Sequence, residues 1–318
     1  MKIFDCFMYF DEDLLLDLRL NILNDYIHKF IIIEAAEDHQ GNKRELKFDI
    51  RKFIKFKEKI KYIPLDKIPI DQNIKIKKNW HEGHLRDQSM RNSIGYNLTE
   101  AEPNDWVIIS DLDEIPNPKK INAFKKQMRF AVFKQLHFYY KFNLLSQINP
   151  YWYGSRICVK KYLRSPQWLR ELKFKKRPFW RIDKLRLNNI IEDGGWHFCN
   201  LKEPEKLLYK YKNLCETNDP INFKEKIDER FLNINEIEKR IIKGEDIIGR
   251  EDLAKKGDLT YMSDQIEFVR RHMENLTGKT LSWKDSLQTS INNLYQIYKG
   301  IEILQQEFEL TNKNKIIL

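Results

Sequence analysis

The chain has few cysteines, and no two of them have metal-site spacing. Only four occur in 318 residues, and no C-x-x-C pair is present, which argues against a cysteine zinc site. A count this low does not suggest a disulfide framework either, so we expect reduced thiols in a reducing compartment. The cysteines are Cys6, Cys158, Cys199 and Cys215.

Long hydrophobic runs are also missing. No apolar stretch reaches the roughly 18 residues that cross a bilayer, and the first residues lack the pattern of a signal peptide. We therefore expect a cytoplasmic or otherwise soluble protein, with no membrane anchor in this chain. Linkers rich in Gly, Pro or Ser and repeats of fixed period are absent too. The sequence predicts one catalytic domain over residues 1–244 and a helical C-terminal extension over residues 245–318, packed on the same domain.

The composition supports a folded core and gives a positive net charge. Hydrophobic residues make up 42% of the chain and aromatic residues 13%, which excludes wholesale disorder. Lys and Arg number 57 against 47 Asp and Glu, a net charge of +10. That excess could attract nucleic acid, an anionic membrane surface or phosphorylated ligands. The charges are dispersed and no recognition motif accompanies them, so we do not expect nucleic-acid binding.

Strand and helix signals alternate in the first half of the chain. The strands are continuously apolar, which is typical of a mostly parallel sheet covered by helices on both faces. Aromatic segments between Ala131 and Trp196, such as 133–142 and 151–153, suggest antiparallel strands that complete the sheet. Helix signals dominate from Glu203 onward. The expected strands cover residues 3–7, 29–35, 61–65 and 106–110, and the expected helices cover 11–23, with Asp11 as its cap, and 80–98.

An acidic turn, Asp111-Leu112-Asp113-Glu114-Ile115-Pro116, follows the strand at 106–110. In α/β sheets, ligands bind beyond the carboxyl ends of the strands. Two carboxylates there suit Mg²⁺ or Mn²⁺, which also bind phosphate oxygens and stabilise charge on a leaving group. We predict a metal and diphosphate site with Asp111 and Asp113 as ligands. Glu114 could orient the turn. An isolated D-x-D triplet is also common in solvated surface turns.

Five segments in a fixed order resemble glycosyltransferase family 17. The resemblance runs from about Phe4 to about Gly244 and implies a GT-A-type nucleotide-sugar-binding fold. It also implies a divalent metal, UDP-GlcNAc as the donor, a glycan hydroxyl as the acceptor and inversion at the anomeric carbon. The segments are Phe4–Phe7, Leu18–Asn21, Ile33–Ala35 with Gly41, Asp111–Pro116 and Gly194–His197.

The last of these segments supplies three candidate site residues, each with a structural alternative. Gly195 permits close approach of the backbone to a ligand. Trp196 could stack on a sugar face, or it could pack in the core. His197 could bind the same metal or the diphosphate, or it could be a buried histidine with a satisfied hydrogen bond.

Three further residues are candidates for donor binding. Glu34 ends the second strand, where uracil or ribose is held in GT-A folds, although it could equally cap a loop. Arg86, with Arg91 as a weaker rival, could contact the donor phosphates. Lys210 could neutralise a phosphate. Surface ion pairs and a solvated helix face are the alternatives for these cations.

Inverting transfer also needs a base that deprotonates the acceptor hydroxyl. Asp193 and Glu216 are both candidates, and the sequence does not choose between them. A different nucleotide-sugar donor, a metal-dependent nucleotidyltransferase and a metal hydrolase are the competing functions. A nucleotidyltransferase usually carries a glycine-rich phosphate loop, and neither G-x-G-x-x-G nor G-x-x-x-x-G-K occurs.

Overall fold

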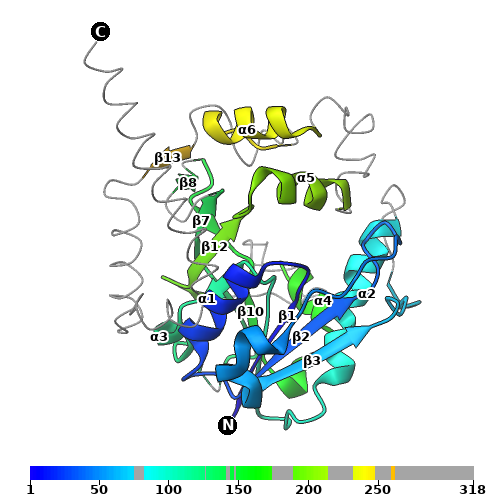
Figure 1. Cartoon of the computed structure of the whole chain (residues 1–318). Helices are drawn as coiled ribbons and strands as arrows, with labels where there is room; N and C mark the ends of the chain where they lie inside the picture. The colour runs from blue at the N-terminus through cyan, green and yellow to red at the C-terminus, as the bar shows by residue number, and fades with distance from the viewer. Residues whose placement is uncertain are drawn as a thin grey trace.

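The computed structural model describes residues 1–74, 82–125, 127–140, 144–146, 148–173, 189–213, 232–247 and 259–261. A seven-stranded sheet in the order β11-β6-β10-β4-β1-β2-β3 forms the centre of the molecule (Figure 1). Its strands are β1 (Ile3–Met8), β2 (Lys29–Ala35), β3 (Ile60–Leu65), β4 (Trp106–Ile109), β6 (Phe130–Phe133), β10 (Arg156–Val159) and β11 (Ile190–Ile191).

The central sheet is mostly parallel, as the sequence predicts. Strands β3, β2, β1 and β4 run parallel, and Cys6 of β1 lies between Ile31 of β2 and Ile109 of β4. Strand β10 is antiparallel to both β4 and β6, which confirms an antiparallel addition to the sheet. The carboxyl ends of the four parallel strands therefore share one edge, where the loops that follow them meet.

Helices cover both faces of this sheet, which explains the continuously apolar strands. Helix α1 (Asp13–Leu23) packs Leu16 and Leu20 against one face, and α2 (Glu82–Asn97) packs Met90 and Ile94 against the other beside α4 (Pro166–Glu171). Alternate strand residues supply the two cores, since successive side chains point to opposite faces. The remaining short helical elements are η1 (Ile50–Lys59), α3 (Pro118–Ile121) and η2 (Lys160–Tyr162).

The start of α1 differs from the prediction. The helix begins at Asp13 with Glu12 at the N-cap position and no side-chain capping bond. Asp11, the expected cap, instead forms an ion pair with Lys202. The carboxylate is drawn to the buried ammonium group rather than to the backbone N–H groups of the helix.

A second sheet, which the sequence interpretation did not foresee, lies beyond the carboxyl edge of the first. Its order is β13-β8-β7-β12-β5, with β9 paired to β7. The aromatic run expected as one segment, 133–142, is divided at Lys134: β6 belongs to the first sheet and β7 to the second. The strands are β5 (Glu114–Pro116), β7 (Gln135–Tyr139), β8 (Leu144–Ser146), β9 (Tyr151–Trp152), β12 (Gly195–Cys199) and β13 (Leu259–Tyr261).

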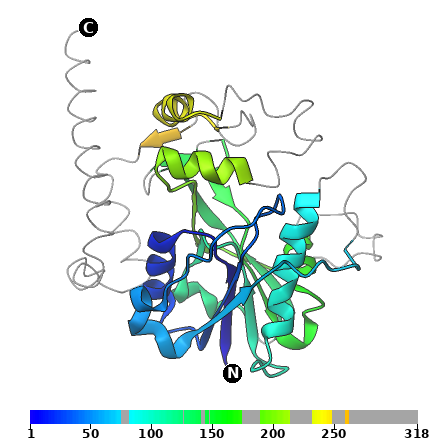
Figure 2. The ribbon, with the colours of Figure 1, turned by 45° about the vertical axis from the view of Figure 1, so that its right-hand side comes forward.

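Two helices, α5 (Pro204–Asn213) and α6 (Ile234–Lys243), lie beside the second sheet on the side away from the N-terminus (Figure 2). They agree with the helix signals after Glu203. Within the predicted extension, 245–318, the described residues include a strand, β13, which pairs with β8. Across the described ranges, no helix is both long enough and apolar enough to cross a membrane.

Candidate functional site

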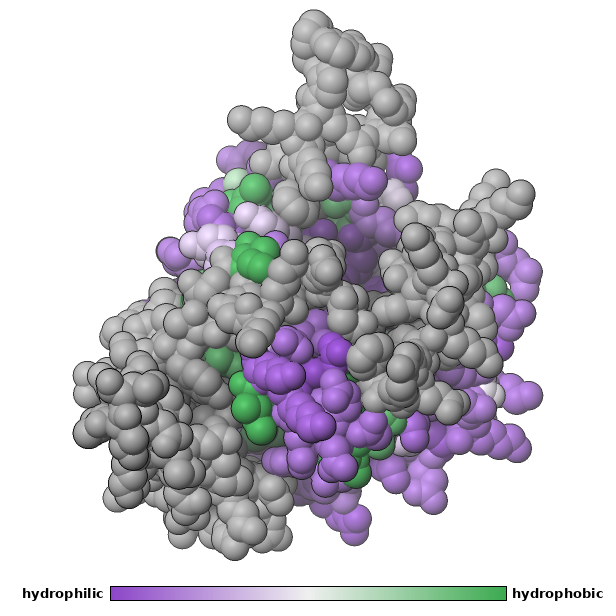
Figure 3. Space-filling model, turned by 90° about the horizontal axis from the view of Figure 1, so that it is seen from above, coloured by the Kyte–Doolittle hydropathy of each residue, from purple (hydrophilic) through white to green (hydrophobic). Residues whose placement is uncertain are grey.

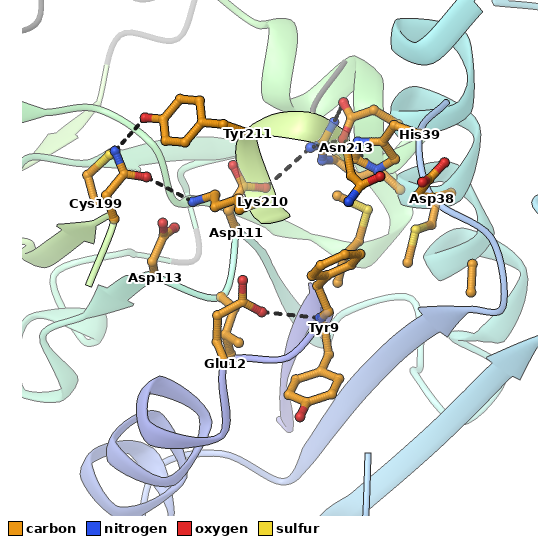
Figure 4. A pocket seen from close by; sticks show the side chains of 18 of the residues that line it. Tyr9, Glu12, Asp38, His39, Asp111, Asp113, Cys199, Lys210, Tyr211 and Asn213 are labelled. Carbon is orange, nitrogen blue, oxygen red and sulfur yellow. Dashed lines mark hydrogen bonds and ion pairs between the residues drawn. The ribbon is translucent and has the colours of Figure 1, made fainter. Parts of the chain in front are cut away.

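A cavity of about 320 Å³ lies at the carboxyl edge of the central sheet, a volume suited to a small-molecule ligand. Its walls come from the loops after β1, β2 and β4, from α2, from β7 and β12, and from α5. On the face that carries α5 and α6, the described residues are mainly hydrophilic (Figure 3). Side chains of the acidic turn and of α5 come close together in the cavity, among them Asp111, Asp113, Lys210 and Tyr211 (Figure 4).

Asp111 lines the cavity and is held by two arginines. Its carboxylate lies 2.8 Å from Arg170 and 3.2 Å from Arg91, and its side chain is 38% exposed. Burial alone would raise the pKa of Asp111, but the charge of Arg170, and next that of Arg91, outweighs it and holds this pKa well below its usual range. The carboxylate is therefore ionised, and its charge is already balanced by protein groups.

Glu114 belongs to the same turn, and its side chain is fully buried. Arg170 donates to both of its carboxylate oxygens, at 2.6 and 2.9 Å, and Trp152 Nε1 donates at 2.7 Å. The backbone N–H of Asp111 donates to the same carboxylate at 3.0 Å. These contacts agree with an orienting role for Glu114, because they connect the turn to β9 and α4.

Asp113 and His197 form a close pair of metal-ligating groups in the cavity. Oδ2 of Asp113 lies 3.7 Å from Nε2 of His197. The imidazole stacks on Trp152 and on His137, with ring centroids 4.7 and 4.8 Å apart. Stacking fixes the plane of the ring and thereby aims Nε2 towards Asp113. Nδ1 of His197 is buried, and it has no hydrogen-bond partner in the described part of the chain.

This donor set, one carboxylate and one imidazole, fits a divalent ion that is bound together with a substrate. Mg²⁺ usually takes one or two protein ligands and completes its shell with water and phosphate oxygens. No group of three or more His, Cys, Asp or Glu side chains suited to a metal occurs among the described residues. Asp113 and His197 could thus hold an ion that a diphosphate helps to bind, rather than a closed protein-only site. The carboxylate of Asp113 suits both Mg²⁺ and Mn²⁺, whereas the imidazole nitrogen of His197 is softer than the oxygen ligands that Mg²⁺ prefers and so favours Mn²⁺.

Gly195 and Trp196, both predicted to bind the donor, are occupied by packing. Gly195 has φ of +123°, and a Cβ there would lie 2.1 Å from the carbonyl oxygen of Ile115. The glycine thus allows β12 to pair closely with β5. Trp196 has no exposed surface and belongs to the core cluster on the α1 face of the central sheet. Neither residue is among those that line the cavity.

Glu34 is also engaged in structure. Its buried carboxylate accepts hydrogen bonds from Arg44 at 2.9 Å, from Tyr62 at 2.9 Å, and from the backbone N–H groups of Lys47 and Phe48 at 2.7 and 3.0 Å. It anchors the loop that follows β2, which was the structural alternative for this residue. The burial of Tyr62 and its hydrogen bond to Glu34 raise the pKa of the tyrosine.

Of the three predicted cations, two line the cavity and one, Arg86, does not. Lys210 of α5 lines the cavity and donates to Asn200 at 3.2 Å. Arg86 lies against Gly41 and pairs with Glu82 at 3.2 Å, whereas its rival Arg91 is a lining residue.

Of the two base candidates, Asp193 lies outside the lining of the cavity. Asp193 is 63% exposed and pairs with Lys120 at 3.2 Å, ahead of the first residue of β12. Glu216 lies outside the described residues.

Several residues that shape the cavity escaped sequence reasoning. Glu12 lines the cavity and forms an ion pair with the ammonium group of Lys202 at 2.9 Å. Burial would raise the pKa of Glu12, but Lys202 and then Lys210 lower it to about 2. Arg170, which holds Asp111, stands 59 positions away from it along the chain, so no local pattern connects them.

A family model described as glycosyltransferase family 17 matches residues 1–253, a span that includes every residue lining the cavity. A search of curated proteins gave no match. Because the family model covers most of the 318 residues, the chain belongs to glycosyltransferase family 17 and is a transferase of glycosyl groups.

Proposed function

We propose that the chain is an inverting, metal-dependent glycosyltransferase that transfers GlcNAc from UDP-GlcNAc to a hydroxyl of a glycan acceptor. The observation that carries the proposal is the pair formed by Asp113 and His197, 3.7 Å apart, at the edge of a mostly parallel sheet where α/β folds bind ligands. The family membership supports the transfer of a sugar, and the sheet order is compatible with a GT-A-type fold.

Asp113 and His197 are the residues that would hold Mn²⁺ or Mg²⁺. A bound ion supplies positive charge next to the diphosphate, which lowers the energy of the negative charge that develops as the bond to the sugar breaks. Asp111 would have to leave Arg91 and Arg170 in order to join them. We therefore propose that the main role of Asp111 is to order the two arginines around the donor, and that binding the metal is its secondary role.

The remaining groups of the cavity have supporting roles in this proposal. Lys210 places a positive charge on α5, where it can neutralise a phosphate oxygen. Side chains of α5 line the cavity, where they would limit the access of water that competes with the acceptor hydroxyl. Glu216 is our candidate for the base, since Asp193 is exposed and paired with Lys120 outside the cavity.

A thermal-shift screen tests the donor and the metal together. UDP-, GDP-, ADP- and CMP-sugars are added to the full chain with and without Mn²⁺, and the melting temperature is recorded. A ligand that binds only the folded state stabilises it by about 2.7 kcal/mol at a hundredfold excess over its Kd. We expect a shift with UDP-GlcNAc that requires Mn²⁺. A shift with GDP-sugars alone would refute the UDP-GlcNAc assignment.

Product analysis with a donor labelled in the sugar separates the competing reactions. Sugar transfer moves the label to the glycan and releases UDP, whereas hydrolysis leaves the label on free sugar and a nucleotidyltransferase moves the nucleotide. The anomeric configuration of the product distinguishes inversion from retention. We expect an inverted glycoside.

A further inference from the structure

A buried arginine, Arg19 of α1, lies directly beneath the acidic turn. It has no exposed surface, and its guanidinium pairs with both carboxylate oxygens of Asp5 in β1, at 2.6 and 2.8 Å. The Leu18–Asn21 segment that contains it contributed to the family resemblance. The donor site described above gives Arg19 no role, because it is not one of the residues that line the cavity.

The rest of the guanidinium is directed at the turn. Nη1 donates to the backbone carbonyl oxygens of Asp111 and Leu112 at 3.2 Å, and to that of Glu114 at 2.8 Å. Nη2 also donates to Oγ of Ser110. An arginine that served only to neutralise Asp5 would not need three turn carbonyls around its other nitrogen. The rigid fork of the guanidinium makes this combined geometry possible, which a lysine could not reproduce.

Between residues 111 and 114, the carbonyl oxygen of Asp113 is the one to which Arg19 does not donate, and it is held from another side. The oxygen of Asp113 accepts a hydrogen bond from the backbone N–H of Phe198 at 2.9 Å, and Phe198 follows His197 in β12. The turn is therefore fixed from below by α1 and laterally by the strand that carries the imidazole. Its backbone determines where the side chains of Asp111 and Asp113 leave the main chain.

We propose that Arg19 is a positioning residue of the donor site. It holds the backbone from Ser110 to Glu114 in the shape that places Asp113 opposite His197, and Asp5 holds the guanidinium in place. The consequence for ligand binding rests on the proposed function. The effect on the turn itself does not, because it follows from the hydrogen bonds alone.

Hydrogen exchange followed by mass spectrometry measures the effect on the turn in the full chain. In Arg19→Lys, we expect the backbone amides of residues 110–114 to exchange at least about tenfold faster. The exchange rates in β2 should change much less, since local opening reports local stability. Ser110→Ala keeps the pair with Asp5 and should show a weaker form of the same pattern, which provides a readout if Arg19→Lys does not fold. Ile22→Ala, a buried change on the same helix, is the matched control.

Binding of UDP with Mn²⁺ to the same variants measures the consequence. Groups that orient metal ligands typically change affinity by about 10–100-fold when replaced, so Arg19→Lys should weaken binding in that range while Ile22→Ala stays within about twofold. Equal acceleration of exchange in the turn and in β2, or the same pattern in Ile22→Ala, would overturn the proposal. If the turn loosens selectively but the unaltered chain binds no UDP with Mn²⁺, the positioning role stands and the proposed function fails.

Discussion

Replacing Arg170 by Met should destabilise the protein mainly through Glu114. Arg170 donates to Glu114 at 2.6 and 2.9 Å and to Asp111 at 2.8 Å. Breaking a buried ion pair from one side costs about 3–5 kcal/mol. Glu114 is fully buried and Asp111 is 38% exposed, so solvent screening reduces the contribution of Asp111. Because Trp152 and a backbone N–H still satisfy Glu114 in part, we expect a loss near the lower end, about 3 kcal/mol.

A double-mutant cycle in urea unfolding isolates this pair. Arg170→Met, Glu114→Gln and the double variant are compared with the unaltered chain at neutral pH. If Arg170 acts chiefly through Glu114, the double variant loses much less free energy of unfolding than the two single variants lose together. The difference, which is the coupling energy, should be about 2 kcal/mol or more. Single losses that add to within about 0.5 kcal/mol would refute the reasoning.

Two further predictions concern the cavity wall and the second sheet. The pKa of Glu12, lowered from 4.5 to about 2, gives a stabilisation that is complete above pH 4.5 and is lost as the pH falls towards 2. In urea unfolding, Glu12→Gln should therefore lower the free energy of unfolding by about 3 kcal/mol at pH 6 and by much less at pH 3. An equal loss of stability at both pH values would contradict this. Gly195→Ala should lower the free energy of unfolding by at least about 3 kcal/mol, because the new Cβ would meet the backbone of Ile115 at 2.1 Å; unchanged stability in the same assay would show that β12 can move away from β5.

Continuous apolar runs made the central sheet predictable. The strand at 29–35 has the bounds that its hydrophobicity indicates, because a strand buried on both faces requires apolar residues throughout. The second sheet was not predictable in the same way. Nothing local shows that the chain changes sheets at Lys134, or that β13 pairs with a strand more than a hundred residues earlier, since such pairings depend on the assembled fold.

The candidate site was predictable where local sequence determines position. An acidic turn after a buried strand had to reach the carboxyl edge, and the structure places Asp113 next to His197. Gly195 and Trp196 carried the same sequence signal as His197, yet they serve strand pairing and the core. Alternation along β12 points Trp196 to the face opposite His197, whereas the close approach of β5 fills the space beside Gly195. The arginines that hold Asp111 come from distant segments, so their contacts could not be inferred without the fold.

Calorimetric titration of UDP into the full chain, with and without Mn²⁺, tests the central claim most directly. The unaltered chain should bind UDP much more tightly when Mn²⁺ is present, and Asp113→Ala should remove that dependence. Asp193→Ala, an exposed carboxylate outside the lining of the cavity, is the matched control and should bind like the unaltered chain. Metal-dependent binding of UDP that survives in Asp113→Ala would contradict the account.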